Sequence, residues 1–220
     1  MLVLALDTSC AAITAAVAEV GDAVELLAVK VTVDARAHGE QLAPSIRYCL
    51  DRAGIGIDRL GAVVVGVGPG PFTGLRVGLV TAAVIAELRG IPAYGVCSLD
   101  AIAGALDGPG TLLVAADARR HEVYWARYVN GMRVGEPAVS RPADVPVQAE
   151  AMTGAGARRY ADVLALPLLA VDYPDAEALV RCAAARVRDA AEGEPLTPLY
   201  LRRPDAVAPG PAKSVTPVPR

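Results

Sequence analysis

The chain has 220 residues, of which 54% are hydrophobic and 4% aromatic, enough apolar material for one large or two small globular domains. A formal net charge of −3 gives no long-range attraction for nucleic acid, so any role with RNA must be indirect or shared. The four cysteines are far apart and form no Cys-x-x-Cys pair, which argues against a zinc or redox site.

The opening apolar run, residues 1–20, is interrupted by Asp7 and lacks a basic start. We therefore interpret it as strand and not as a secretion signal. No uncharged apolar stretch reaches the roughly 18 residues that a membrane helix needs. These features predict a soluble, cytoplasmic protein without membrane contact.

The first half of the chain predicts a sheet with covering helices. In chain order we expect strands at 2–6, 13–20 and 24–33, a helix at 36–53, a strand at 62–67, a helix at 73–89 and a strand at 92–97. A strand meander followed by strand–loop–helix–strand units is typical of an α/β domain with a mixed sheet. We assign residues 1–108 to this first lobe.

The second half begins in the same way and then loses its regularity. Strands are expected at 112–116 and 122–128, an irregular, proline-punctuated stretch follows, and an Ala/Arg-rich helix is expected at 175–192. We assign residues 109–203 to a smaller second lobe. Residues 204–220 hold five prolines and little that can be buried, so we expect a disordered tail.

Asp7 and the hydroxyls that follow it stand at the end of the opening strand. A carboxylate beside hydroxyl groups can serve a phosphate or a metal ion. Ordinary turn chemistry at a strand end accounts for the same residues. Both interpretations remain open for this turn.

A glycine-rich loop at 66–78 joins a buried strand to an apolar helix. It lacks the Gly-Lys-Ser/Thr ending of a Walker loop and the Gly-x-Gly-x-x-Gly of a Rossmann turn. Its chemistry fits either a phosphate at the helix N-terminus or a packing loop without a ligand. The helix that follows is apolar nearly all round, which is typical of a helix that is deeply buried or covered by a partner.

Five motifs, in this order, carry a resemblance that spans nearly the whole chain. They are Asp-Thr-Ser at 7–9, His-Gly-Glu-Gln-Leu-Ala-Pro at 38–44, the glycine loop at 68–76, Asp-Ala-Arg-Arg-His-Glu-Val-Tyr at 117–124 and Pro-Leu-Tyr-Leu-Arg at 198–202. In them the chain resembles the TsaB (YeaZ) family. The resemblance implies an α/β, actin/hexokinase-like (ASKHA) fold with two related lobes, the second reduced.

The resemblance also implies a function. It is that of a non-catalytic scaffold subunit that binds TsaD, and with it the ATPase TsaE, for threonylcarbamoyl transfer to N6 of adenosine 37 in tRNAs reading ANN codons. The surface that binds TsaD would form a homodimer in the absence of TsaD. The chain would contact tRNA only through the complex. No cofactor of its own is implied, and ATP or ADP is expected, if anywhere, at the interface of the complex.

Two sets of residues follow from these considerations. The expected nucleotide or phosphate contacts are Asp7, Thr8, Gly68, Gly70, Thr73, Gly74 and Asp117. The expected partner interface is formed by His38, Leu42, Ile46, Thr73, Arg76, Val77, Val80, Thr81 and Val84. No residue is expected to be catalytic.

A metal site is not expected. The catalytic relative TsaD carries two metal-binding histidines just after the strand that follows its glycine-rich loop, and by alignment Ser98 and Ile102 stand there in this chain. Isoleucine cannot ligate a metal, and His38 and His121 are the only histidines in the sequence. A metallopeptidase is therefore disfavoured, although a carboxylate-only site stays open.

An ASKHA-type small-molecule kinase or ATPase is the alternative function. Asp7 in the first lobe and Asp117 in the second would face each other across a cleft. The turn after Asp117 is Ala-Arg-Arg-His, which is bulky and basic where such enzymes have small glycine and hydroxyl residues. That difference argues against catalytic turnover of a nucleotide.

Overall fold

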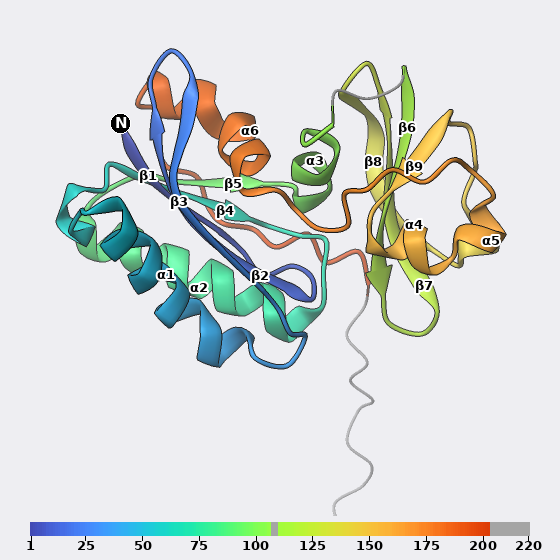
Figure 1. Cartoon of the computed structure of the whole chain (residues 1–220), viewed down its shortest axis with the longest axis horizontal. Helices are drawn as coiled ribbons and strands as arrows, with labels where there is room; N and C mark the ends of the chain where they lie inside the picture. The colour runs from blue at the N-terminus through green and yellow to red at the C-terminus, as the bar shows by residue number, and fades with distance from the viewer. Residues whose placement is uncertain (107–109, 203–220) are drawn as a thin grey trace, which may run out of the picture.

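The computed structural model describes residues 1–106 and 110–202, which form two lobes lying side by side (Figure 1). The first sheet has the order β3-β2-β1-β4-β5 and the second the order β8-β7-β6-β9. The strands are β1 (Leu2–Asp7), β2 (Ala12–Val20), β3 (Val24–Val33), β4 (Ala62–Gly66), β5 (Ala93–Val96), β6 (Thr111–Ala118), β7 (Glu122–Val129), β8 (Met132–Ser140) and β9 (Ala151–Thr153). The helices are α1 (His38–Ala53), α2 (Phe72–Arg89), α3 (Ser98–Ala103), α4 (Ala155–Arg159), α5 (Ala161–Leu164) and α6 (Ala176–Arg188), with short 3-10 turns at Ile57–Arg59 and Pro142–Asp144.

The two sheets share one topology. In each sheet three antiparallel strands form a meander, and the next strand returns to pair in parallel with the first strand of that meander. A helix follows that fourth strand in both lobes, but α2 is long where α4 is short. In its described residues, the second lobe thus repeats the first with one strand fewer and without a counterpart of α1.

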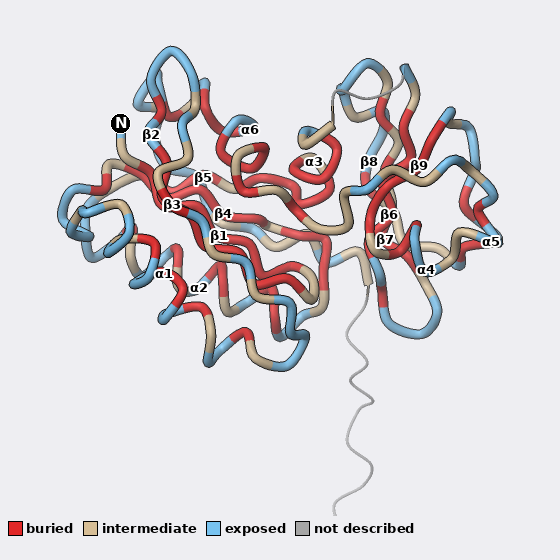
Figure 2. Tube along the Cα trace, viewed as in Figure 1, coloured by how far each residue is buried: buried red, intermediate tan, exposed pale blue. Residues whose placement is uncertain are grey.

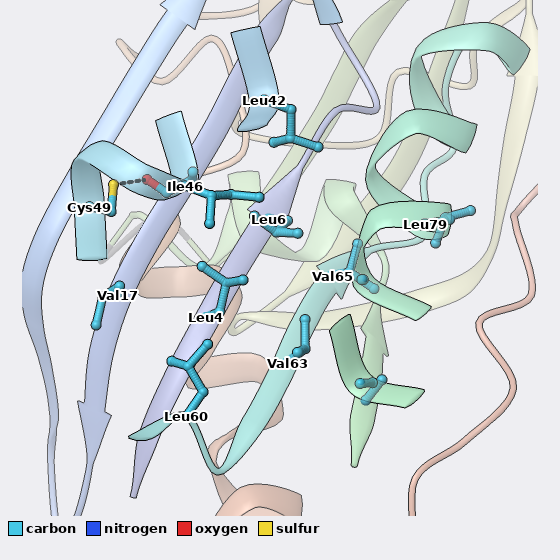
Figure 3. Packing of buried hydrophobic residues seen from close by; sticks show 14 of the residues in the cluster. Leu4, Leu6, Val17, Leu42, Ile46, Cys49, Leu60, Val63, Val65 and Leu79 are labelled. Atoms are coloured by element: carbon cyan, nitrogen blue, oxygen red, sulfur yellow. Dashed lines mark hydrogen bonds between the residues drawn. The ribbon is translucent and has the colours of Figure 1, made fainter. Parts of the chain in front are cut away.

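The strands β1, β2 and β4 of the first sheet are buried on both faces because helices cover each of them (Figures 1 and 2). On one face, apolar side chains of α1 and α2 pack on β1 and β4, as Figure 3 shows for Leu42, Leu6 and Val65. On the other face, α6 packs Leu179 and its neighbours against the small residues of β1, β2 and β4. A continuous apolar run such as Ala62–Gly66 is the sequence signature of a strand buried in this way.

The predicted strands and helices of the first half are confirmed, and the second half contains β8, β9, α4 and α5, which were not predicted. The stretch expected to be irregular contains a strand, β8, with Pro137 inside it. Proline is tolerated there because β8 is an outer strand and its pairing with β7 is already interrupted by a bulge between Trp125 and Arg127. The short helix α3 was not predicted from the sequence.

Helix α6 lies in the range that we assigned to the second lobe, yet it packs on the first sheet. The division near residue 108 therefore separates the two sheets but not the helices that cover them. The tail predicted at 204–220 falls outside the described residues. Among the helices of the described residues, none combines the length and the hydrophobicity of a transmembrane span.

Candidate functional site

Asp7, at the end of β1, is enclosed by the chain itself. It is 1% exposed, and its Oδ1 accepts hydrogen bonds from the Ser9 N–H at 2.8 Å and the Ser9 hydroxyl at 2.7 Å. Its Oδ2 accepts one from the Ser98 hydroxyl at 2.6 Å. Burial raises the pKa of Asp7, while these hydrogen bonds and the nearby His38 act in the opposite direction. Both carboxylate oxygens are already engaged.

Thr8 ties the same turn to the start of α2. Its hydroxyl donates to the Gly74 carbonyl at 2.8 Å and accepts from the Gly78 N–H at 3.0 Å. Thr8 is 1% exposed. The hydroxyl therefore bridges a carbonyl and an N–H that lie four residues apart inside α2, and it fixes the turn against this helix.

The glycine loop wraps closely around residues 7–9. A Cβ on Gly66 would lie 1.8 Å from Oδ2 of Asp7, and one on Gly70 would lie 2.0 Å from the Ser9 carbonyl oxygen. Real Cβ atoms do not come so close, so glycine is needed for this contact. The geometry favours the packing interpretation of the loop, because its glycines bring the chain against itself.

His38 belongs to this packed turn and not to a surface. It is 9% exposed, and its Nε2 lies 2.7 Å from the carbonyl oxygen of Cys10. Leu42 and Ile46, on the same helix, are 1% and 6% exposed and lie in the first core. The apolar stripe of α1 therefore covers its own sheet, and the prediction that these three residues lie at a partner interface stays a prediction.

The rest of the predicted interface lies on α2, whose outer side is open. Val80 is 60% exposed, Val84 49% and Leu88 79%. Thr73 and Arg76 are exposed as well, whereas Val77 and Thr81 are half-buried. Apolar side chains at helical spacing therefore form an uncovered stripe on this helix within the described structure.

Beside this stripe, a groove of about 880 Å³ runs between α2 and the segment 194–200. Tyr200 stacks on Phe72 with ring centroids 5.1 Å apart, and the Arg76 guanidinium lies 3.6 Å from the centre of the Phe72 ring. The Arg76 Nε–H also donates to the Tyr200 hydroxyl at 3.0 Å. The sequence did not predict that Tyr200 would contact Phe72 and Arg76, although the motif at 198–202 contributed to the resemblance.

A second cavity, of about 290 Å³, lies between the lobes. Ser9 and Ser98 line it from the first lobe, and Asp117 and Arg159 from the second. The Asp117 carboxylate and the Arg159 guanidinium are 3.3 Å apart and partly exposed. Burial raises the pKa of Asp117, and Arg159 opposes that shift. Asp7 itself lies behind the two serines, so the two aspartates do not both line this cavity.

The positions expected to mark a lost metal site have other roles. The Ser98 hydroxyl is the group that holds Asp7, and it also accepts the Gly68 N–H at 3.3 Å. Ile102 is 1% exposed and lines the cavity between the lobes. In the part of the chain that the structure describes, no group of three or more His, Cys, Asp or Glu residues is placed to hold a metal ion.

Three kinds of comparison place the chain among known proteins. The family model for TsaD, tRNA N6-adenosine threonylcarbamoyltransferase, matches residues 29–161. The structure of YeaZ from Pseudomonas aeruginosa is similar with a TM-score of 0.76 and 30% identity over 91% of this chain and 99% of that one. The chain belongs to the TsaB (YeaZ) family. Its fold is accordingly that of the YeaZ structure.

Two curated relatives add detail. The tRNA threonylcarbamoyladenosine biosynthesis protein TsaB of Escherichia coli is 35% identical over 127 residues, which are 54% of this chain and 55% of that protein. The uncharacterized protein ML0378 of Mycobacterium leprae is 51% identical over 207 residues. That match covers 93% of this chain and 56% of ML0378, so the chain spans about half the length of that relative.

Proposed function

We propose that this TsaB-family chain takes part in forming threonylcarbamoyladenosine in tRNA as a non-catalytic subunit. In this role it binds a TsaD protein through the exposed side of α2, and TsaE joins through the resulting complex. The names of the relatives support the pathway, and the geometry of this chain supports the binding role.

The observation that carries the proposal is the enclosure of Asp7. A catalytic carboxylate must reach a substrate, a metal or a water molecule. The Asp7 oxygens instead accept hydrogen bonds from Ser9 and Ser98, and the glycine loop closes over the turn. The loop also approaches the backbone of this turn, since a Cβ on Gly70 would lie 2.0 Å from the Ser9 carbonyl oxygen. Any nucleotide of the assembly is therefore proposed to lie against a partner and not inside this loop.

The exposed side of α2 supports the partner role. A partner that removes Val80, Val84 and Leu88 from water would be bound more tightly, because each Å² of buried apolar surface stabilises the complex by about 25 cal/mol. Arg76, held by Phe72 and Tyr200, adds a positioned cation at one end of the stripe. A charged rim beside an apolar centre is the usual composition of a specific interface.

The experiment is a binding titration with the TsaD protein of the same cell. We expect Val84→Glu to weaken binding at least about tenfold, because the carboxylate would be buried without a partner. Val163→Glu is the matched control, since Val163 is 51% exposed on α5, away from α2, compared with 49% for Val84. Normal TsaD binding by a folded Val84→Glu protein would contradict the proposed interface.

The cavity between the lobes favours one alternative, a small-molecule kinase or ATPase that uses Asp117. The test is ATP hydrolysis by the purified chain, with Asp117→Asn and Asp7→Ala in parallel. We expect no turnover above the rate in buffer. Hydrolysis that disappears in either variant would favour the alternative and overturn the non-catalytic role.

A further inference from the structure

The cavity between the lobes, of about 290 Å³, differs in character between its floor and its mouth. Leu99 and Ile102 line it from α3 and are buried, so they form part of the floor. Asp117, Asp172 and Arg159 line it from the second lobe, and their side chains are partly exposed at the mouth. A molecule that enters the cavity therefore meets charged groups first and an apolar surface behind them.

The polar groups in the floor are already used by the chain. The hydroxyls of Ser9 and Ser98 both donate their hydrogen bonds to the Asp7 carboxylate. Pro69 and Pro71 also line the cavity, and proline has no N–H to donate. These residues offer no hydrogen-bond donor to a phosphate group, whereas they tolerate an apolar substituent.

At the mouth, Asp117 and Arg159 form a loose pair. One guanidinium nitrogen of Arg159 lies 3.3 Å from each oxygen of the Asp117 carboxylate. Tight hydrogen bonds between such charged groups are about 2.7–2.9 Å long. The neighbouring pair of Arg158 and Asp172 reaches 2.7 Å. Asp117 and Arg159 therefore keep capacity for a further partner, a cation at the first and an anion at the second.

Tyr173 adds a hydroxyl donor to the same cavity wall. Burial raises the pKa of its phenol, and the nearby Cys10, Asp172 and Asp117 act in the same direction. The phenol consequently keeps its proton at neutral pH and can donate it to an anionic group. The wall thus combines an acceptor for a cation with two donors for an anion.

We propose that this cavity binds a free amino acid with a small apolar side chain. The ammonium group of the ligand lies against Asp117, its carboxylate against Arg159 and the Tyr173 hydroxyl, and its side chain against Leu99 and Ile102. The two opposite charges of one small molecule match the two opposite charges of the mouth. The site is separate from the exposed side of α2, so the inference stands independently of the proposed function.

Size and charge both favour this ligand over a nucleotide. Pockets for drug-sized ligands measure about 300–1,000 Å³. The cavity, at about 290 Å³, is smaller than that range. The phosphates of a nucleotide would also bring several negative charges to a mouth that already holds Asp117 and Asp172. A zwitterionic amino acid brings no net charge.

The first test is an NMR titration of the full chain with L-valine. We expect L-valine to bind at least about tenfold more tightly than 3-methylbutanoate, which lacks the ammonium group, or isobutylamine, which lacks the carboxylate. ATP added in excess should leave L-valine bound. The proposal is overturned if L-valine does not bind, if either analogue binds as tightly, or if ATP displaces L-valine.

The second test assigns the two charges of the ligand. Asp117→Asn should weaken L-valine binding at least about tenfold but should not weaken 3-methylbutanoate binding, because this analogue has no ammonium group. A variant with a merely distorted cavity would lose both ligands.

Glu177→Gln is the matched control for Asp117→Asn. Glu177 pairs with Arg181 at 3.4 Å on α6, outside the cavity, and its side chain is 44% exposed compared with 42% for Asp117. We expect this control to bind L-valine like the wild type. An unchanged affinity in Asp117→Asn, a loss of both ligands in that variant, or an equal loss in Glu177→Gln would overturn the assignment.

Discussion

The turns at Asp7 and Asp117 occupy corresponding places in two related sheets, yet one is closed and the other open. Each aspartate stands near the end of the first strand of its meander, beside the strand that pairs with it in parallel. Asp7 is 1% exposed and engaged by Ser9 and Ser98, whereas the Asp117 side chain is 42% exposed and paired with Arg159. The same topology therefore supports a packed structural turn in one lobe and a polar cavity wall in the other.

The difference follows from what comes after the parallel strand. In the first lobe a long glycine loop leads into α2 and folds over residues 7–9. In the second lobe Gly154 leads directly into the five-residue helix α4, which is too short to close over Asp117. A duplicated fold keeps its strand order while its loops decide whether the equivalent position is accessible.

The largest expected effect comes from opening the closed turn. In Gly70→Ala the new methyl group would meet the Ser9 carbonyl at 2.0 Å, and because the obstacle is backbone the loop must move. We expect a loss of about 1–3 kcal/mol in the free energy of unfolding, measured by urea denaturation. Gly39→Ala is the control, because its methyl group meets nothing within 4 Å. Equal stability of the two variants would contradict a tightly packed turn.

The next comparison removes each carboxylate in turn. Asp7→Asn should lower the free energy of unfolding by about 1–3 kcal/mol, because buried donors from Ser9 and Ser98 lose their ionisable acceptor. Asp117→Asn should have a much smaller effect, since water can replace its exposed partner. Denaturation of both variants under one condition checks the order, and a larger loss at Asp117 would refute the contrast.

The pH dependence of stability should separate the wild type from Asp7→Asn. Because burial raises the pKa of Asp7 in the folded state, the unfolded chain releases this proton first, at about pH 4. Asp7 therefore contributes most below that pH, and its contribution falls as the pH rises through the folded pKa. Denaturation from pH 3.5 upward, at roughly half-unit steps, should show the wild-type advantage shrinking. A stability advantage of the wild type that grows with pH would indicate that folding lowers the pKa of Asp7.

The smallest expected effect concerns the exposed turn at Asp117. Removing the guanidinium in Arg159→Ala should raise the pKa of Asp117, because Arg159 now favours the charged carboxylate. Carboxyl chemical shifts followed through an NMR pH titration measure this directly, with little change in unfolding expected. An unchanged titration would show that the pair is not formed in solution.

The sequence predicted the first lobe better than the second for a physical reason. Buried strands such as Ala62–Gly66 and the helical spacing of α1 are local signals, and both are confirmed. Strand β8 was missed because its proline is acceptable only at a sheet edge, and edge position is set by pairing with β7.

The candidate site was predictable in its residues but less so in their roles. The motifs identified Asp7 and the glycine loop, but whether the loop meets a ligand or its own chain depends on a distance between segments some sixty residues apart. Leu42 and Ile46 were expected at an interface, yet an apolar helix stripe is the same signal whether a sheet or a partner covers it. Exposure distinguishes the two cases and leaves Val80 and Val84 on the outside.

The central claim, that the chain acts by binding and not by catalysis, is tested most directly by the threonylcarbamoyladenosine content of tRNA. Cells in which the native chain is replaced by Asp117→Asn or by Val84→Glu would be compared by nucleoside mass spectrometry. We expect a normal content with Asp117→Asn and a loss close to that of a deletion with Val84→Glu. A loss with Asp117→Asn and a normal content with Val84→Glu would contradict it.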